Sequence, residues 1–365
     1  MSMHGPINSV DDRSSVKRSV RWRASRSCAT SSTALAPLVG RWVWAWSMRV
    51  VLITPQGPTS RTGNRVAARR WARILRRLGH RVQLAADYDG QPADLLVAIH
   101  AWRSAAAIER FRARYPDRLV IVQLSGTDIY EYLQSEYSTT RRAMALADRL
   151  VALNDRAWRV VPPHLRDRLR VIFQSAEPIA GGWRPSRRAV VISVIGHLRD
   201  VKDPLRAAWA AQMLRRASRV RVEQVGRAYT PAWAARARAE MANNRRYLWH
   251  GDVPAAAVRR LLARSHAMVI SSSSEGGANV VSEAAVAGVP ILASRIDGNV
   301  GLLGRDYPGY FPVGDTEALA RLMQRIESEP TFVRHLQRAL RRRAPLFKAT
   351  REIAAWRRLL AEIAR

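Results

Sequence analysis

The segment from Ser271 to Pro290, SSSSEGGANVVSEAAVAGVP, holds the residue pattern best suited to chemistry in this chain. It predicts a strand end, a glycine-containing turn and a helix that begins near Asn279. Such a turn leaves free backbone N–H groups at a helix N-terminus, where a diphosphate can bind. Glu275 would lie in the loop mouth, and Glu283, about one turn into the helix, could accept two hydrogen bonds from a ribose diol. Taken alone, the EGG turn could also be a simple strand–helix connection with a solvated carboxylate.

A second anion-binding pattern, GHLRDVK, runs from Gly196 to Lys202 and follows another strand-like run. A glycine turn followed by cations that enter a helix places Arg199 and Lys202 where they can neutralise phosphate. The alternative is a surface lysine at a helix start. Composition weakens that alternative, because Lys17, Lys202 and Lys348 are the only lysines among 61 basic residues, and an ammonium and a guanidinium are not interchangeable.

Three further loops are predicted to hold an anionic acceptor, because each follows a strand-like run and ligands of open α/β sheets bind at the carboxyl ends of strands. The first loop precedes a helix and so presents N–H groups to an anion. His100 ends the second strand, where it could be structural or catalytic, and Asp128 follows the third. The candidate acceptor-binding residues are Gly63, Asn64, Arg65, Ser125, Gly126 and Thr127.

From Met48 onward, short apolar runs alternate with amphipathic helical stretches, which predicts parallel-sheet α/β units. A linker at residues 177–186, EPIAGGWRPS, divides the chain into two Rossmann-like domains that face a cleft, an acceptor domain at 48–178 and a donor domain at 179–365. Residues 351–365 place apolar side chains on one face and predict a terminal helix. The predicted strands cover residues 50–54, 82–86, 95–100, 119–124, 150–153, 171–173, 190–195, 220–225, 268–271, 291–294 and 310–313.

The spacing Glu275-x7-Glu283 followed by EAAVAGVPILAS, together with the GHLRDVK motif, resembles the retaining, metal-independent GT-B glycosyltransferases of the GT4 type. The resemblance implies that Glu275 contacts the transferring sugar, that Glu283 holds the nucleotide ribose and that Lys202 binds the diphosphate. The arginine that usually follows the glycine is replaced here by His197, so we assign its role to Arg199. The phosphate-binding N–H groups would be those of Gly277, Ala278 and Asn279.

A narrower resemblance covers nearly all of the chain from Met48 onward. It is carried by SRTGNRVAARRWARILRRLGHRV, YDGQPADLLVAIHAWRSA, SGTDIY, GHLRDVKDP, EGGANVVSEA and ASRIDGNVGLLGRDYPGYFPVGDTEAL. These stretches resemble the selenosugar synthases of selenoneine biosynthesis, the SenB type. That family joins a UDP-sugar, UDP-N-acetylglucosamine or UDP-glucose, to selenophosphate and releases a 1-seleno-sugar, UDP and phosphate.

The resemblance implies two small-molecule substrates and no cofactor. Selenophosphate is a soft, anionic nucleophile, so forming the carbon–selenium bond needs positioning and charge neutralisation more than a base. The subsequent loss of phosphate needs an activated water, for which His100, Asp128 and Glu275 are the candidate bases. Cations and backbone N–H groups bind the phosphates, so no metal is expected. Asp87-Tyr88-Asp89 has a metal-binding D-x-D form, but its position after the second strand favours a solvated loop.

Composition limits the alternatives. The chain has 365 residues with 47% hydrophobic and 25% charged residues, which is typical of folded proteins despite a net charge of +32. A polyanion-binding protein remains one alternative, and a conventional GT4 enzyme with a hydroxyl acceptor is the other. Arginine is spread along every predicted helix without an aromatic-interleaved basic stripe, so no nucleic-acid partner is expected. No apolar run approaches the roughly 18 residues of a transmembrane segment, and a single cysteine excludes a disulfide framework.

Residues 1–47 carry seven basic and two acidic side chains without clear periodicity. We interpret them as a disordered extension, or as the product of a start codon placed too early, with the folded protein beginning at Met48. The stretch from Ala34 to Gly40 makes a poor export signal, so we expect a cytoplasmic protein.

Overall fold

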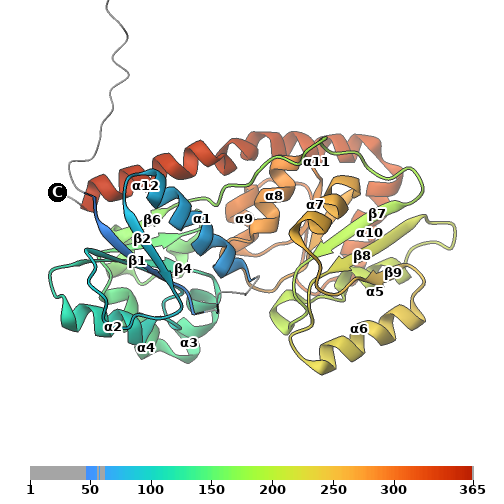
Figure 1. Cartoon of the computed structure of the whole chain (residues 1–365). Helices are drawn as coiled ribbons and strands as arrows, with labels where there is room; N and C mark the ends of the chain where they lie inside the picture. The colour runs from blue at the N-terminus through green and yellow to red at the C-terminus, as the bar shows by residue number, and fades with distance from the viewer. Residues whose placement is uncertain (1–46, 56, 58–61, 364–365) are drawn as a thin grey trace, which may run out of the picture. The chain divides into compact units, whose positions relative to one another are not determined.

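The structure is a computed structural model that describes residues 47–55, 57 and 62–363 (Figure 1). The predicted N-terminal extension therefore lies outside the described residues, apart from Ser47. All described residues belong to one unit of the chain, which spans residues 44–365. No helix among them is long and apolar enough to cross a bilayer.

The first half of this unit forms a six-stranded parallel sheet with the order β2-β1-β3-β4-β5-β6. Its central strands are continuous apolar runs buried on both faces, as in sheets covered by helices on both sides. The order reverses between β1 and β3, so the loops after these two strands border one crevice at the carboxyl edge. The strands are β1 (Arg49–Ile53), β2 (Arg81–Ala85), β3 (Leu95–Ile99), β4 (Leu119–Leu124), β5 (Arg149–Ala152) and β6 (Leu169–Val171).

The second half forms another six-stranded parallel sheet, with the order β12-β11-β10-β7-β8-β9. Here the order reverses between β7 and β10, so the turn that ends in Lys202 and the loop that holds Glu275 leave the sheet at the same crevice. The strands are β7 (Val190–Ile195), β8 (Val220–Val225), β9 (Tyr247–Trp249), β10 (Ala267–Ile270), β11 (Ile291–Ser294) and β12 (Tyr310–Phe311). The two sheets confirm the predicted α/β fold with two Rossmann-like halves.

Helices cover both sheets. In α1 the residues Trp71, Ile74 and Leu75 are buried, as is Leu78 directly after the helix, in agreement with their spacing. The helices are α1 (Gly63–Arg77), α2 (Ala105–Arg114), α3 (Leu133–Ser135), α4 (Tyr137–Ala145), α5 (Arg206–Gln212), α6 (Pro231–Asn243), α7 (Ala255–Arg264), α8 (Asn279–Ala287), α9 (Asp297–Leu303), α10 (Thr316–Ser328), α11 (Pro330–Arg343) and α12 (Ala349–Ile363).

The last helix, α12, crosses back to the first sheet and lies beside α1 (Figure 1). Trp356 packs edge-on against Trp71, with 4.8 Å between ring centroids, and Leu359 and Leu360 enter the same buried cluster as β1. Aromatic pairs of this geometry stabilise a core beyond their buried area. The terminal helix therefore completes the core of the first half.

Candidate active site

Lys202 and Glu275 meet at the carboxyl edge of the second sheet. Lys202 ends a short 3-10 turn after β7, and its Nζ donates a hydrogen bond to Glu275 Oε1. Ser272 Oγ donates to the same oxygen at 2.6 Å, and Glu275 is only 9% exposed. The structure thus joins the GHLRDVK and EGG motifs through an ion pair that the sequence analysis did not predict.

The loop before α8 depends on glycine. Gly277 has a φ of +153°, which side-chain-bearing residues rarely adopt, and a Cβ at this position would collide with Leu153. The backbone then enters α8 at Asn279, as predicted, and Ala278 as N-cap offers no side chain to bind the first N–H groups. These N–H groups are therefore suited to an external anion.

The N-termini of α8 and α1 lie together. Asn279 Nδ2 donates to Gly63 O at 3.4 Å, and Asn279 Oδ1 accepts from Arg70 Nη1 at 3.0 Å. Neither helix has an acidic residue in its first turn, so no first-turn carboxylate offsets the positive ends of the two helix dipoles.

Arg65, in the first turn of α1, adds a buried cation to this region. It is 7% exposed, and its Nε has no hydrogen-bond partner among the described residues. Burial, together with the neighbouring charge of Arg69, lowers the pKa of Arg65. Buried polar groups are normally satisfied, so this N–H is the clearest sign that a ligand completes the site.

Glu283 lies one turn into α8 and is partly buried. Burial raises the pKa of its carboxyl, an effect that Arg259 and Arg70 partly offset. No hydrogen bond from a described residue reaches the carboxylate. It is thus desolvated and available to accept hydrogen bonds from a diol.

His100 follows β3 in a strained conformation, with a φ of +76°. Its Nδ1 accepts the N–H of Arg103 at 3.3 Å, so the proton of the neutral ring lies on Nε2, which contacts Thr127 Oγ1 at 2.9 Å. Burial lowers the pKa of His100, and the opposing influence of Asp128 is smaller. Strain of this kind gathers at functional sites.

Asp128 is fully buried and organises the surrounding backbone. Its Oδ2 accepts the N–H groups of Ala101 and Ser125, and its Oδ1 accepts those of Gly126 and Ile129, at 2.7 to 3.1 Å. Every one of these is a backbone donor, so the carboxylate holds the His100 turn and the Ser125 loop together. This geometry suits an organising role better than that of a base.

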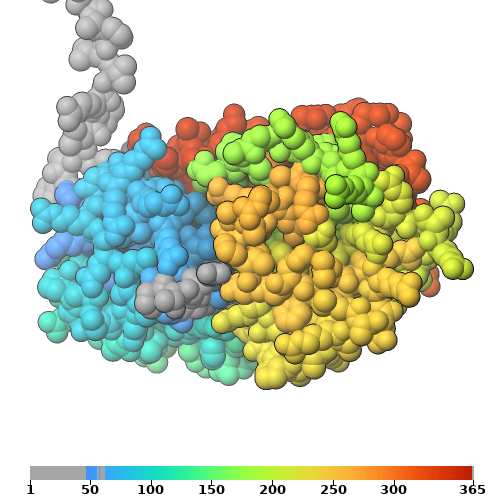
Figure 2. Space-filling view, turned by 45° about the vertical axis from the view of Figure 1, so that its right-hand side comes forward, coloured from blue at the N-terminus to red at the C-terminus, as the bar shows by residue number. Residues whose placement is uncertain are grey.

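The loop from Ser125 to Thr127 packs directly on the EGG loop. A Cβ on Gly126 would lie 2.8 Å from Gly276 Cα, and Asn154 Nδ2 donates to Gly276 O at 2.8 Å. The space-filling view shows the residues near α1, in blue, and those near α8, in orange, in contact (Figure 2). The predicted donor and acceptor loops are therefore brought together.

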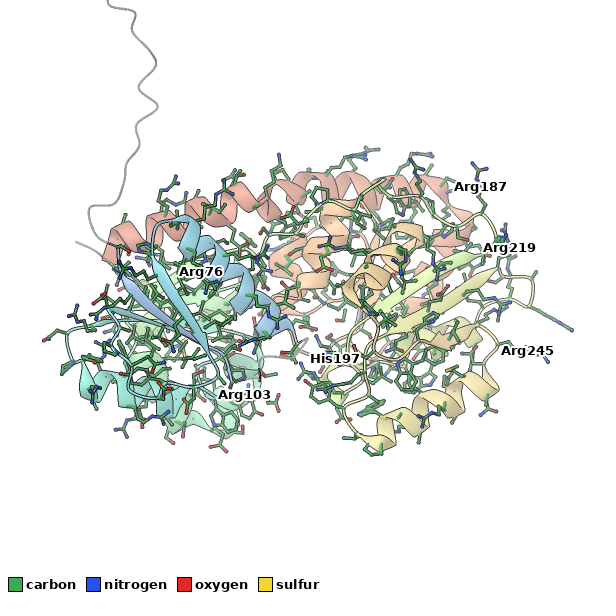
Figure 3. All side chains as sticks on the ribbon, in the orientation of Figure 1. Arg76, Arg103, Arg187, His197, Arg219 and Arg245 are labelled. Atoms are coloured by element: carbon green, nitrogen blue, oxygen red, sulfur yellow. The ribbon has the colours of Figure 1, made fainter. Side chains whose placement is uncertain are left out.

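Arg199 and His197 lie at the outer side of this region. The Arg199 guanidinium lies 5.6 Å from the centroid of the Tyr229 ring, which Arg227 also approaches at 5.3 Å. Burial and the nearby cations lower the pKa of His197, so it stays neutral and cannot replace the charge of an arginine. Figure 3 shows His197 facing the space between the two halves.

Two other features lie elsewhere. Asp87 pairs with Arg110 at 2.7 Å on the exposed loop after β2, and no cluster of three potential metal ligands occurs within the described ranges. Residues 247–249 form β9, which no apolar run predicts, and Trp249 Nε1 donates to Gly226 O at 2.8 Å. Three residues are too few for a periodic signal.

The sequence analysis missed Arg70, Gln174 and Glu352, of which Arg70 hydrogen-bonds to the other two behind the α8 entry. Arg70 lies on a helix with many exposed arginines, and Glu352 follows it by 282 residues. No local pattern distinguishes such residues from solvated ones.

The comparisons with known proteins support the fold. Residues 183–345 match the family model for glycosyl transferases group 1. The Anabaena protein Alr3699/HepE, solved with UDP and glucose, is 14% identical, with a TM-score of 0.69 over 86% of this chain and 100% of that one. Sucrose-phosphate synthase from Thermosynechococcus elongatus is 16% identical, with a TM-score of 0.69 over 86% and 98%. A UDP-forming α,α-trehalose-phosphate synthase from Burkholderia xenovorans is 12% identical, with a TM-score of 0.62 over 74% of each chain. The predicted GT-B fold is confirmed.

Proposed function

We propose that the protein is a GT-B glycosyltransferase that uses a UDP-sugar. The observation that carries this proposal is the meeting of Lys202, Glu275 and the α8 N-terminus at the switch point of the second sheet. The match to glycosyl transferases group 1 covers this region, and the similarly folded Anabaena protein Alr3699/HepE has been solved with UDP and with UDP-glucose.

Each donor residue has a distinct task in this proposal. The N–H groups at the α8 entry and the ammonium of Lys202 bind the diphosphate, while Glu283 accepts the ribose hydroxyls. A diphosphate competes with Glu275 for Lys202 and so leaves the Glu275 carboxylate available to the sugar. Arg199 needs only to swing from the Tyr229 ring to add a second cation.

We further propose that the acceptor is selenophosphate, which the α1 N-terminus and the unpaired Arg65 Nε would bind. A selenium lone pair attacks the anomeric carbon, and the bond from that carbon to the UDP oxygen breaks with its electrons on UDP. Water then cleaves the phosphorus–selenium bond and yields phosphate and the 1-seleno-sugar. Glu275 is the base that this geometry favours, because its Oε2 accepts no hydrogen bond from a described residue, whereas the Nδ1 lone pair of His100 already accepts the N–H of Arg103.

The test supplies the full chain with UDP-N-acetylglucosamine or UDP-glucose and freshly generated selenophosphate, and follows the seleno-sugar by mass spectrometry and UDP in a parallel assay. Product that is lost in Lys202→Ala but kept in Lys348→Ala supports the proposal, because the Lys348 side chain is exposed and makes no hydrogen bond or ion pair with a described residue. UDP release only with hydroxyl acceptors indicates a conventional glycosyltransferase.

A polyanion-binding protein would behave differently. Basic side chains such as Arg187, Arg219 and Arg245 project outward at the far end of the second sheet (Figure 3). Binding through such residues would fall steeply with salt and would be unchanged in Lys202→Ala and Glu283→Ala. No turnover of either UDP-sugar, combined with that behaviour, would overturn the enzyme proposal.

A further inference from the structure

The first turn of α12 carries a carboxylate, Glu352, whose side chain is completely enclosed. Its Oε1 accepts hydrogen bonds from Trp71 Nε1 at 2.8 Å and from Arg70 Nε at 3.1 Å. Its Oε2 accepts from the N–H of Ser175 at 2.9 Å and from the hydroxyl of the same residue. A buried charge is tolerated only with such partners, and all of them lie outside α12.

Arg70 extends this hydrogen-bonded chain to the donor loop. Its Nη1 donates to Asn279 Oδ1 at 3.0 Å, and its Nη2 donates to Gln174 Oε1 at 2.5 Å. Gln174, which is 3% exposed, then donates from Nε2 to Gly277 O at 2.6 Å. The guanidinium therefore uses all three nitrogens, and two of its branches end on residues 277 and 279.

We propose that α12 acts as a latch that orients the phosphate-binding N–H groups of the donor loop. Glu352, Arg70 and Gln174 are positioning residues in this proposal, which rests on the proposed use of a nucleotide diphosphate at the α8 entry. Gly277 has no side chain to fix its peptide, so the hydrogen bond from Gln174 to its carbonyl holds the turn. An anion site built from N–H groups depends on their fixed direction.

The other end of α12 provides a matched control. Glu362 accepts hydrogen bonds from Arg149 Nε at 3.0 Å and from Arg170 Nε at 2.8 Å, and its side chain is 33% exposed. The partners lie on the last two strands of the first sheet, Arg149 on β5 and Arg170 on the edge strand β6. Glu362→Gln therefore weakens the attachment of α12 to the first sheet but does not act on the donor loop.

The test compares Glu352→Gln and Glu362→Gln in the full chain. An amide in place of the Glu352 carboxylate turns an N–H₂ group toward hydrogen-bond donors. The hydrogen bonds that one of the two carboxylate oxygens accepts are therefore lost. We expect the Kd for UDP to rise about tenfold in Glu352→Gln, equivalent to about 1.4 kcal/mol, and to change less than twofold in Glu362→Gln. Without nucleotide, hydrogen exchange of the peptide covering residues 273–287 should accelerate only in Glu352→Gln.

Gln174→Ala keeps the proposal testable if Glu352→Gln fails to fold, because it removes the bond to Gly277 O and leaves α12 docked. Equal UDP affinity and equal exchange in Gln174→Ala and the wild type would overturn the latch. If hydrogen exchange accelerates in Gln174→Ala but the wild type does not bind UDP, the latch proposal stands and the proposed use of a nucleotide is refuted. Equal weakening by Glu362→Gln would also overturn the latch, since it would reduce the effect to general loosening of α12.

Discussion

The contact between the Gly126 loop and the Gly276 loop predicts a large and separable effect of single methyl groups. A Cβ on Gly126 would lie 2.8 Å from Gly276 Cα, whereas ordinary contact begins at 3.4 Å. Gly126 also has a φ of +115°. We expect Gly126→Ala to incur a left-handed backbone cost of about 1–2 kcal/mol and an overpacking cost of about 1–3 kcal/mol.

Alanine variants at two other glycines allow the backbone cost and the overpacking cost to be measured separately. Gly276 lacks a positive φ, but a Cβ there would collide with the Ser125 backbone, so Gly276→Ala has the overpacking cost alone. Gly90 has a φ of +98° with nothing within 4 Å, so Gly90→Ala has the backbone cost alone. Thermal or denaturant unfolding should therefore rank Gly126→Ala as the least stable of the three.

The rate of UDP release should rank the three variants differently from their stability. Gly276 N lies even closer to the added methyl group than Gly276 Cα does, so the two loops must separate by roughly 1 Å to admit it, and a misplacement of that size can cost about 100-fold in rate. We expect the rate of UDP release to fall by that order in Gly126→Ala and Gly276→Ala and to stay within about threefold of the wild type in Gly90→Ala. Wild-type rates in Gly276→Ala would show that the two loops do not touch in the active enzyme.

Three further predictions follow from single side chains. Glu283→Gln should weaken UDP binding about tenfold by calorimetry. Its free energy of unfolding at pH 7.5 should equal or exceed that of the wild type, because a carboxyl with a raised pKa destabilises the fold once the pH exceeds that pKa. A lower free energy of unfolding would contradict this reasoning. His100 has a lowered pKa, so its contribution to stability is complete above about pH 6.5 and is lost as the pH falls further. The unfolding midpoint of His100→Asn should therefore fall less between pH 7.5 and 5.5 than that of the wild type. Arg65→Leu should raise the KM for selenophosphate at least tenfold with little change in that for the UDP-sugar; a selective rise in the latter would place Arg65 at the donor.

Much of the fold could be predicted because buried parallel strands are continuous apolar runs. β4, β7, β8 and β11 have the predicted bounds, and most of the others differ by one or two residues. The short β9 was missed, because three residues carry no periodicity. The packing of α12 on the first sheet could not be predicted either, since amphipathicity shows that a face is buried but not which partner buries it.

The site was partly predictable for a related reason. Motifs that follow strands must lie at the carboxyl edge, so Lys202, Glu275 and His100 could be placed without coordinates. The ion pair between Lys202 and Glu275, and the link from Arg70 to Glu352, join residues far apart in the chain. An arginine in an arginine-rich helix carries no local sign of burial, so these contacts required the structure.

The position of α12 also affects how the protein can be made. Trp71 and β1 leave the ribosome early, but Trp356, which covers them, is synthesised after every other described strand and helix. Until then, α1 covers this face of the first sheet, but the apolar cluster that it forms with β1 and β3 lacks Trp356, Leu359 and Leu360, and exposed apolar surface of this kind promotes aggregation. The core of the first half is therefore completed only after the second half has been synthesised, and a chain released before Ala349 would leave this part of the cluster exposed.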